Sequence, residues 1–570
     1  MSNVDDDHPA VEKAKPASRW ICYAPILAII LASAAAHLWC VHSQFYLDDL
    51  WQIRDNDLIR ESRPWENPLV SWFYLSLIAQ TKIFGMSSIA IHAVNWILHT
   101  AVACVIYLSA RDYMQDRAYK QAALFGALLF AVHPLGSEIP NYARTQDLAW
   151  VTLFSLLAAW QFYRFQSMRK WRNLIISVLC IAGATCSKGP GFFHAMMMVG
   201  VVGIAMMATH YRDFFHLHRR RFWLLLAGIA LLVIVTIPIN PWLKLTGNLG
   251  SPRSIGHAFT VARVFWEFTW RGFIPKDLSA DHHIAETLVR PGEGWWGVAD
   301  DVAWMSMIGM LLFAIVSLVL CWRKGSRVFG MCLLLYVGSM LLRFLYFVPE
   351  YMPEYRVYPG LPWFCLALAI ALTVFWRWLG AKKGWIPAAI LLGVFAFLSA
   401  KRSFQWHDLN VLMAHVLEKY PGQMRAIWVL QRNDIDQGNW QAVIDRHETL
   451  YPRVKERYFA EMRANLPNRE MLTGHFALSE VGCTGIYARA VAHQRGAAAG
   501  MRVINQLEMY MRALRLDPVD HRLHWVTFEH MKGLVLEASG DYAGAVEWIG
   551  RSDVGHDRKL DLQRVQEKMR

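Results

Sequence analysis

Apolar runs of about 17–25 residues, the length that crosses a bilayer as an α-helix, recur along the first part of this chain and restrict its fold more than any other feature. Inside a bilayer a backbone must satisfy its own hydrogen bonds, which favours helices or closed barrels. The composition agrees, since 55% of the 570 residues are hydrophobic and only 18% are charged. We therefore predict an all-α polytopic membrane protein.

The apolar runs predict about eleven spanning helices. They cover residues 20–40, 88–110, 121–134, 148–164, 173–187, 190–209, 222–240, 302–321, 328–347, 359–379 and 385–400. Residues 1–19 are polar and predict a cytoplasmic leader before a retained helix, not a cleavable signal. Segment 63–86 is apolar but lacks a cationic flank, so we expect a helix lying at the external interface. The Trp-rich loop 241–301 is expected to hold another interfacial element.

The cations of the connecting loops predict the orientation of the chain. Lys and Arg gather in alternate loops, at 111–120, 164–172, 212–221, 323–327 and 382–383. The positive-inside rule assigns these loops and the N-terminus to the cytoplasm. It also explains the net charge of +13 without a nucleic-acid partner. The other loops, and everything after residue 400, are then external, and most of the unusual charged residues lie there.

The last part of the chain, residues 401–570, changes character and predicts an external helical domain. Apolar residues follow a helical period from Leu409 onward, and no further span occurs. GNWQAV (438–443) and GDYAGAV (540–546) resemble the turn and second helix of tetratricopeptide repeats, and ALRLDP (513–518) resembles a repeat end. No strict period is kept, so a generic helical domain is the alternative. Such arrays bind peptides or protein partners on a concave surface.

Two external loops carry acidic motifs. YLDD (46–49) places Asp48 and Asp49 just beyond the first span, where a carboxylate can deprotonate a hydroxyl or ligate a divalent cation. The loop HPLGSEIPNYARTQDLAW (133–150) brings His133, Glu138 and Arg144 together between two spans, with Asp147 following. The nine Cys show no CxxC or Cys/His spacing, so neither a disulfide framework nor a zinc site is expected.

Three further motifs suit a ligand at the membrane surface, and in two of them that ligand is an anion. Lys188, in CSKGPG, is either a phosphate ligand or a lysine that snorkels to the interface. Asp281 and His282, in IPKDLSADHHI, are candidates for substrate or metal contact. PEYMPEYRVYPG supplies Glu354, Arg356 and Tyr358. Arg356 either binds phosphate through two N–H groups or pairs with a neighbouring acid.

In this order the motifs resemble the transmembrane and tetratricopeptide-repeat O-mannosyltransferases and their bacterial relatives, which include pilin glycosyltransferases. Those enzymes belong to the GT-C superfamily, as do the protein O-mannosyltransferases. The resemblance covers residues 20–410 and rests on Asp48-Asp49, WENPL, FG, His92, Asn95, His99, His133-Pro134, Glu138, Arg144, Asp147-Leu148, Ser187-Lys188, Pro275, LSAD (278–281), Glu354, Arg356, Tyr358 and Pro359. Gly189 replaces the acid that usually follows SK, and the EYRVYP spacing is altered.

The resemblance implies a GT-C catalytic core over residues 20–400 that uses a polyprenyl-phosphate-linked sugar. The acceptor is expected to be a hydroxyl of a pilin or another surface protein, at the external face of a bacterial inner membrane. Asp48 or Asp49 would act as general base of an inverting displacement, and Glu138 would position the acceptor or a metal. The donor phosphate and substrate would contact Arg144, Lys188, Arg356, Tyr358, Glu354, His133, Asp281 and His282.

A divalent cation, Mg²⁺ or Mn²⁺, is a possible cofactor, with Asp49, Glu138 and His282 as candidate ligands. Three other functions remain open at this point. They are a lipid-linked polysaccharide ligase, polymerase or other glycan-modifying transferase, a transporter, and a membrane-anchored repeat scaffold. Charged residues at span ends, not at the membrane midplane, argue against the transporter.

Overall fold

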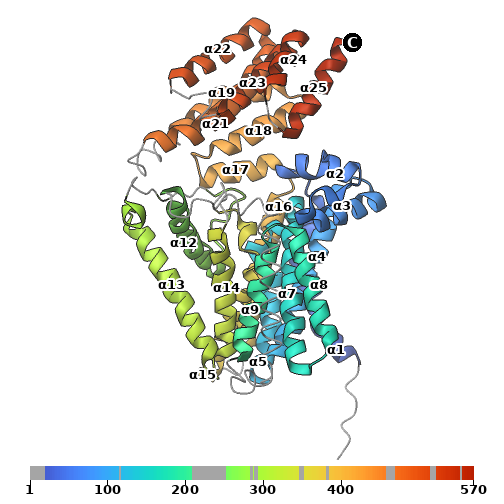
Figure 1. Cartoon of the computed structure of the whole chain (residues 1–570), viewed down its shortest axis with the longest axis vertical. Helices are drawn as coiled ribbons and strands as arrows, with labels where there is room; N and C mark the ends of the chain where they lie inside the picture. The colour runs from blue at the N-terminus through green and yellow to red at the C-terminus, as the bar shows by residue number, and fades with distance from the viewer. Residues whose placement is uncertain are drawn as a thin grey trace, which may run out of the picture.

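The computed structural model describes residues 19–114, 117–207, 252–282, 287, 293–298, 300–345, 352–380, 384–457, 469–513, 522–552 and 555–570. Throughout this part of the chain the regular elements are helices. A helical bundle forms one half of the molecule, and a second set of helices lies across one end of it (Figure 1). The predicted all-α fold is thus confirmed.

The long helices of the bundle coincide with the predicted spans. They are α1 (Arg19–His37), α4 (Ser88–Tyr113), α5 (Arg117–Ala131), α7 (Gln146–Met168), α8 (Trp171–Ser187), α9 (Gly191–Met207), α13 (Asp301–Trp322), α14 (Arg327–Leu341), α15 (Leu361–Trp378) and α16 (Trp385–Gln405). The predicted span 222–240 lies outside the described residues. Within them, 5 helices are long and apolar enough to cross a membrane, or up to 6 if α5 and its bent continuation count as one span. The chain is a multi-pass membrane protein, while the total of about eleven spans stays a prediction.

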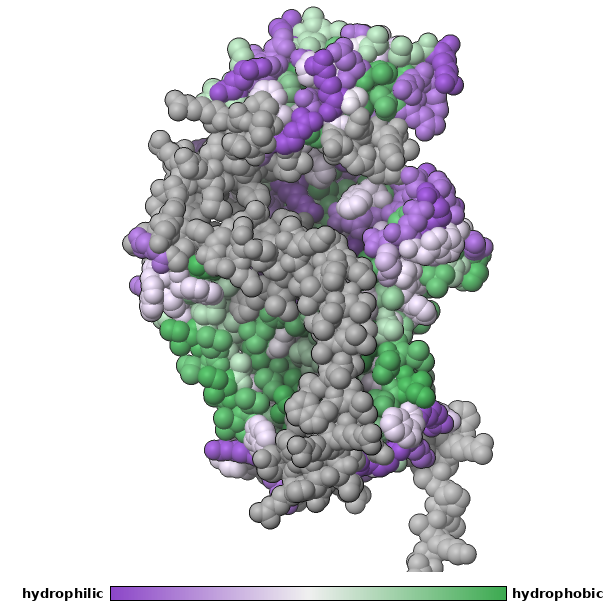
Figure 2. Space-filling model, viewed as in Figure 1, coloured by the Kyte–Doolittle hydropathy of each residue, from purple (hydrophilic) through white to green (hydrophobic). Residues whose placement is uncertain are grey.

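A belt of outward-facing apolar side chains surrounds the bundle. Ile308, Leu312 and Ile315 on α13, and Ile390 and Phe397 on α16, are exposed on the protein surface. Figure 2 shows hydrophobic residues between two hydrophilic ends. Such a large apolar surface is stable only in contact with lipid. The belt therefore marks the membrane zone.

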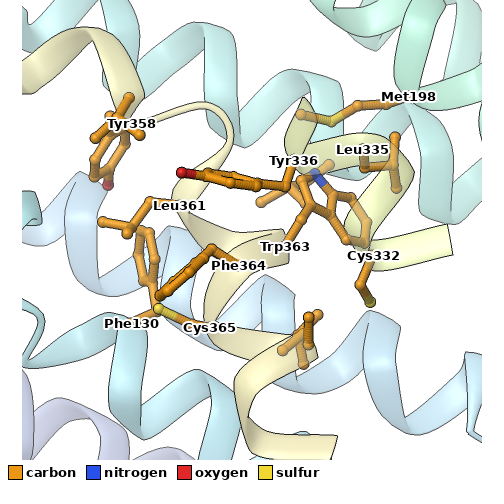
Figure 3. Close-up of a cluster of buried hydrophobic side chains, with 14 of the residues drawn as sticks. Phe130, Met198, Cys332, Leu335, Tyr336, Tyr358, Leu361, Trp363, Phe364 and Cys365 are labelled. Carbon is orange, nitrogen blue, oxygen red and sulfur yellow. The ribbon is translucent and has the colours of Figure 1, made fainter. Parts of the chain in front are cut away.

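The interior of the bundle is densely filled with large side chains. Trp363 of α15, Tyr336 and Cys332 of α14 and Phe130 of α5 are all fully or almost fully buried, and they meet in one cluster (Figure 3). This packing holds the helices rigidly, which fixes the loops at their ends.

The loops sort to the two ends of the bundle as the cation pattern predicts. Exposed cations, including Arg169, Lys170, Arg323 and Lys324, lie in the turns after α7 and α13. These turns lie at the end away from the second set of helices, near the start of α1 (Figure 1). The loops with the candidate site residues lie at the opposite end. Which side of the membrane each end faces stays a prediction.

The two long loops contain helices of their own. Segment 63–86 forms η3 (Pro64–Glu66), η4 (Pro68–Val70) and α3 (Ser71–Phe84), beside α2 (Asp57–Arg60). Loop 241–301 contains α12 (Pro252–Phe273), and its expected place at the membrane interface stays a prediction. Phe265 of α12 is fully buried and packs against Phe313 of α13 and Tyr336 of α14. Its apolar face is thus covered by the bundle.

The C-terminal helices form the tail, which comprises α17 (Leu409–Lys419), α18 (Met424–Asp436), α19 (Trp440–Thr449), α21 (Arg469–Arg495), α22 (Ala497–Ala513), α23 (Arg522–Ala538), α24 (Tyr542–Arg551) and α25 (Gly555–Met569). Three of its turns between consecutive helices contain a glycine with positive φ, at Gly438 (74°), Gly496 (92°) and Gly540 (80°). Glycine adopts this conformation without steric cost. GNWQAV and GDYAGAV begin at two of these turns, and α19 and α24 follow directly, so this part of the chain is helical as predicted. The repeat assignment stays a prediction, and ALRLDP lies mostly outside the described residues.

The tail shares a hydrophobic cluster with the bundle. α16 continues to Gln405, beyond the predicted boundary at residue 400. Trp406 is 1% exposed and stacks on Tyr142 with ring centroids 5.6 Å apart. The Tyr46 hydroxyl donates a hydrogen bond to the His407 carbonyl at 2.8 Å. Because both tyrosines flank the candidate site, the tail is part of its surroundings.

Candidate functional site

The two aspartates of YLDD lie in different environments. Leu47, just before them, has a φ of 54°, an uncommon conformation for a side chain other than glycine. Asp49 is fully buried, and its carboxylate accepts hydrogen bonds from the backbone N–H of Tyr46 (3.2 Å) and of Arg144 (2.6 Å). Burial raises the pKa of Asp49 to about 8, although the two N–H groups act in the opposite direction. Asp49 thus ties the acidic loop to the loop that carries Arg144.

Asp48, by contrast, is half-buried and lines a pocket. Its Oδ1 accepts a hydrogen bond from the Trp51 indole at 3.3 Å, and its backbone N–H donates to the Tyr142 hydroxyl at 3.2 Å. In the described part of the chain, no partner contacts its Oδ2. A π-helical turn, η2 (Leu50–Arg54), follows directly. Of the two acids, Asp48 is therefore the one available to a ligand.

The pocket beside Asp48, which we name the Asp48 pocket, lies between the bundle loops and the tail. Tyr142, Asp281 and Tyr355 line it from the bundle side, while Met413 of α17 and Val429 of α18 line it from the tail. Its volume is about 30 Å³, and because one buried water needs about 10–15 Å³ on this measure, it holds a few waters at most. The tail thus forms one wall of the pocket.

Next to this pocket, the three predicted phosphate ligands come together from three loops. Asp147 Oδ2 lies 2.5 Å from Arg144 Nη1 and 2.7 Å from Lys188 Nζ. Lys188 Nζ lies 6.0 Å from the Tyr355 ring centroid, and the Arg356 guanidinium carbon lies 5.7 Å from it. We name Arg144, Lys188 and Arg356 the cation cluster. Its first two members share a single carboxylate and keep one excess positive charge.

Burial also tunes the cluster. It lowers the pKa of Lys188 to about 8; the Asp147 carboxylate acts to raise it, and the charges of Arg144 and Arg356 lower it further. A cation that is poorly solvated and next to other cations gains most from an added anion. This cluster therefore has the electrostatics of an anion site.

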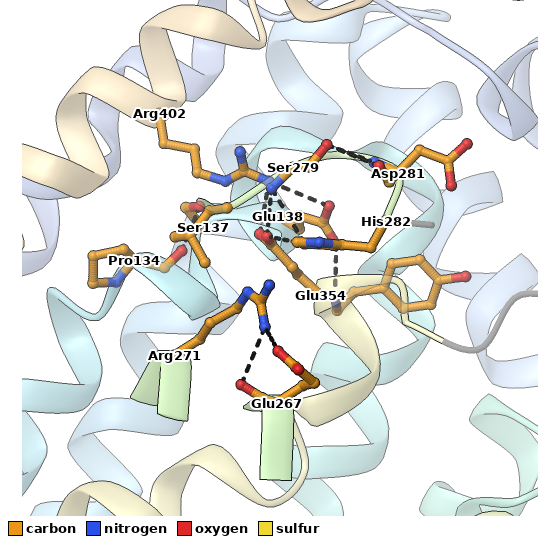
Figure 4. Close-up of polar contacts among 12 residues, drawn as sticks. Pro134, Ser137, Glu138, Glu267, Arg271, Ser279, Asp281, His282, Glu354 and Arg402 are labelled. Carbon is orange, nitrogen blue, oxygen red and sulfur yellow. Dashed lines mark hydrogen bonds and ion pairs between the residues drawn. The ribbon is translucent and has the colours of Figure 1, made fainter. Parts of the chain in front are cut away.

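A second charged group lies behind the pocket, and Figure 4 shows it. Arg402 of α16 is 4% exposed, and its Nη2 lies 2.6 Å from Glu354 Oε2 and 3.6 Å from Glu138 Oε1. The imidazole of His282 contacts Glu354 at 2.7 Å and the hydroxyl of Tyr420 at 2.7 Å. We name these five residues the buried network.

Within the buried network the two glutamates differ in protonation. Burial raises the pKa of Glu138 well above its ordinary value, the charge of Glu354 raises it further, and Arg402 counteracts both. Burial also acts against the ionised form of Glu354, but Arg402 and His282 outweigh it, so the pKa of Glu354 is lowered. The network thus contains an Arg402–Glu354 ion pair beside a Glu138 that tends to be neutral. Glu138 also accepts a 2.6 Å hydrogen bond from the Tyr355 backbone N–H, which fixes that residue near the cation cluster.

Two predicted ligand-binding residues lie in the protein interior instead. Tyr358 is fully buried, and its hydroxyl lies 2.9 Å from His99 Nδ1. His133 is also buried; its Nδ1 accepts from the Leu135 N–H at 3.2 Å and its Nε2 lies 3.0 Å from the Gly272 carbonyl. Both side chains have protein partners, so their contacts hold helices together. Asp281 lines the Asp48 pocket, and its Oδ2 lies 3.8 Å from Arg425 Nη1.

The candidate metal ligands Asp49, Glu138 and His282 already have other partners. Asp49 accepts two backbone N–H groups, and the other two belong to the buried network. Among the described residues, no group of three His, Cys, Asp or Glu could hold a metal ion. The residues described so far therefore do not fit a bound cation, and a divalent-cation requirement stays an untested prediction.

Sequence reasoning missed Arg402, Tyr142 and Tyr355. The sequence does contain a signal that could have identified Arg402. Ser399, Arg402 and Ser403 lie on one face of α16, and all three are buried. A polar stripe of this kind on an apolar helix indicates an inward-facing charge. The tyrosines carry no such pattern, since only the fold brings them to Asp48 and Lys188.

The fold and site define a multi-pass α-helical membrane protein with a cation cluster beside an acidic pocket at one end. Residues 62–242 match a family described as dolichyl-phosphate-mannose-protein mannosyltransferase. The protein O-mannosyl-transferase Tmtc1 of Drosophila melanogaster is 28% identical over 172 residues, which cover 27% of this chain and 20% of the fly protein. No solved structure matches the chain. The two matches confirm the resemblance to the GT-C superfamily.

The family match includes part of the candidate site. Glu138, Arg144 and Lys188 lie within residues 62–242, whereas Asp48 and Arg356 lie outside them. The family match thus contains two of the three clustered cations. The chain spans only a fifth of the length of its fly relative.

Proposed function

We propose that this protein is a glycosyltransferase that moves a sugar from a polyprenyl-phosphate carrier to a hydroxyl group of a protein. The observation that carries the proposal is the position of Tyr355. Its ring lines the Asp48 pocket and lies beside Lys188 and Arg356. A phosphate at the cation cluster and a hydroxyl at Asp48 are thereby neighbours, as a transfer between them requires.

The cation cluster is proposed to bind the donor phosphate. A sugar phosphate diester carries one negative charge, and the departing polyprenyl phosphate carries a second as the sugar–oxygen bond breaks. Lys188, Arg144 and Arg356 stabilise this growing charge more strongly than that of the bound donor, which lowers the barrier. Their place at the end of the membrane zone suits a lipid-linked phosphate.

Asp48 is proposed as the general base. Its carboxylate takes the proton of the acceptor hydroxyl, and the oxygen attacks the anomeric carbon. The bond between that carbon and the phosphate oxygen breaks, and its electron pair leaves with the phosphate. This single displacement inverts the anomeric configuration. Glu138 acts as a positioning residue, because it holds the backbone of Tyr355.

The tail is proposed to move during turnover. A pocket of about 30 Å³ has no room for a sugar and an acceptor chain. Opening it requires Met413 and Val429 to separate from Tyr142 and Tyr355. The same movement would admit an acceptor that the tail helices have bound.

The proposed setting is the external face of a bacterial inner membrane, with a pilin or another surface protein as acceptor. The apolar belt and the cation-bearing turns at one end support this orientation. Mannose is the sugar to test first, because the matching family and the fly relative carry it in their names.

The test is transfer by purified protein in lipid nanodiscs, with polyprenyl-phosphate mannose as donor and a Ser/Thr-rich peptide as acceptor. We expect a glycopeptide of inverted configuration, visible by mass spectrometry and NMR. Lys188→Met should lower kcat/KM by about 10²-fold or more, since it removes a donor to the leaving phosphate. Lys82→Met, an exposed lysine of α3, is the matched control.

Other outcomes of the same assay point elsewhere. Transfer to a glycan but not to peptide identifies a polysaccharide ligase. An unchanged rate in Lys188→Met refutes the phosphate site. In cells, loss of the gene should remove a sugar from surface proteins while its lipid-linked donor accumulates; a scaffold leaves both unchanged.

A further inference from the structure

A second cleft opens on a different side of the bundle, between the end of α12, the outer half of α16 and α17. Its volume is about 590 Å³. It shares no lining residue with the Asp48 pocket. We name it the α16 cleft.

The wall of the α16 cleft changes from apolar to cationic along one helix face. Val394, Leu398 and Lys401 follow each other on α16 at intervals of four and three residues, so they form one stripe. At a rise of 1.5 Å per residue, Lys401 lies about 10 Å beyond Val394 along the helix axis. Phe273 and Ile274 add further exposed apolar surface opposite this stripe.

The lower part of the cleft lies in the membrane zone. Val394 is 48% exposed, and Phe397, one turn further along α16, is 68% exposed. Both belong to the apolar belt. A molecule that fills this part of the cleft therefore comes from the bilayer and is apolar at that end.

The upper part of the cleft is rich in cations. Lys276, Lys401, Arg402 and Lys419 line it, against a single lining carboxylate, Asp277, which pairs with Lys419. Arg402 contacts Glu354 through Nη2, but its Nε and Nη1 are buried without a hydrogen-bond partner in the described structure. Within the described residues, neither Lys276 nor Lys401 forms an ion pair.

We propose that the α16 cleft is a binding site for an anionic phospholipid of the surrounding bilayer. The phosphate lies between Lys276 and Lys401, near the edge of the Arg402 guanidinium, and one acyl chain lies along Val394 and Leu398. A cationic head region about 10 Å above an apolar groove matches the order of groups in a phospholipid. The site is separate from the proposed donor site and does not depend on the transfer reaction.

The test is native mass spectrometry of the purified full-length protein, titrated with phosphatidylglycerol or phosphatidylcholine of identical acyl chains. We expect tighter binding of phosphatidylglycerol. Each lysine near a lipid phosphate contributes about fivefold, so Lys276→Gln with Lys401→Gln should weaken this lipid about thirtyfold. Both lysines are exposed, so neither substitution disturbs the core. Lys82→Gln is the matched control and should change nothing.

A second variant tests the apolar part. Val394→Trp fills the groove without changing its charge, and should weaken both lipids. Lys188→Met should leave phosphatidylglycerol binding intact, which separates this site from the proposed donor site. Wild-type binding in the double lysine variant overturns the proposal. The proposal is also overturned if polyprenyl phosphate binds far more tightly than phosphatidylglycerol and displaces it, because the cleft would then belong to the donor carrier.

Discussion

The contrast between Asp48 and Asp49 gives the sharpest prediction, because neighbouring carboxylates should respond to the same substitution in opposite ways. Asp49→Asn should reduce stability and leave the chemistry of folded molecules largely intact. Asp48→Asn should preserve stability and remove activity. The reason is that Asp49 binds only backbone groups, whereas Asp48 faces the pocket.

The magnitudes follow from these contacts. An amide nitrogen cannot accept a hydrogen bond, so Asp49→Asn leaves the buried N–H of Tyr46 or Arg144 unpaired, whichever protonation state Asp49 has. The unpaired N–H group lowers the free energy of unfolding by about 1–3 kcal/mol. Asp48→Asn keeps the shape of a half-buried side chain, so we expect a change within about 0.5 kcal/mol. Loss of a general base lowers the transfer rate by about 10²–10⁴-fold.

The assay combines thermal unfolding in detergent with initial transfer rates, corrected for the folded fraction. Asp55→Asn is the matched control, because Asp55 lies in the same loop and forms surface ion pairs with Arg54 (2.8 Å) and Arg60 (3.1 Å). It should alter stability by less than about 1 kcal/mol and leave the rate unchanged. The reasoning fails if Asp48→Asn retains the wild-type rate, or if Asp49→Asn abolishes transfer at unchanged stability.

Three further predictions concern the surroundings of the site. Because burial lowers the pKa of Lys188 to about 8, its side chain is charged below that pH and neutral above it. The KM for the donor should therefore rise above pH 8 in initial-rate measurements. Lys188→Arg should abolish this rise, because arginine stays charged. Arg402→Met leaves Glu354 buried without its cation and should lower the free energy of unfolding by about 3–5 kcal/mol. Adding Glu354→Gln should restore part of this loss in thermal unfolding. An unchanged stability of Arg402→Met would contradict the ion pair. Trp406→Ala should lower the free energy of unfolding by about 3–5 kcal/mol. It should also slow transfer, because the ring of Tyr142 loses its stacking partner. A wild-type transfer rate would show that the tail does not order the pocket.

The spanning helices could be predicted from sequence because bilayer thickness acts on each apolar run separately. The packing of α12 against the bundle could not be predicted in this way. Arg263, Glu267 and Arg271 interrupt its apolar residues, so it does not appear as a buried helix, yet α13 and α14 cover Phe265. A helix with one covered face can be recognised only when its neighbours are known.

The end of the bundle that carries the candidate site could be predicted from the sequence, but the contacts of its residues could not. Arg144, Lys188 and Arg356 were assigned to one end of the bundle, where they now form one cluster. His133 and Tyr358 were assigned to ligand binding on the same grounds, but they bind protein groups inside the bundle. Residue type shows that a polar side chain needs a partner, and only the fold shows whether that partner is a ligand.

The distance in sequence between the two walls of the Asp48 pocket has a consequence for biosynthesis. Tyr46 and His407, which join those walls, are 361 residues apart. At about 5–20 residues per second, a ribosome completes the second wall about 20–70 s after the first. During that interval the acidic loop is already in place while its cover has not been made. Newly inserted molecules therefore pass through an uncovered, incomplete form until the tail has been synthesised and has docked.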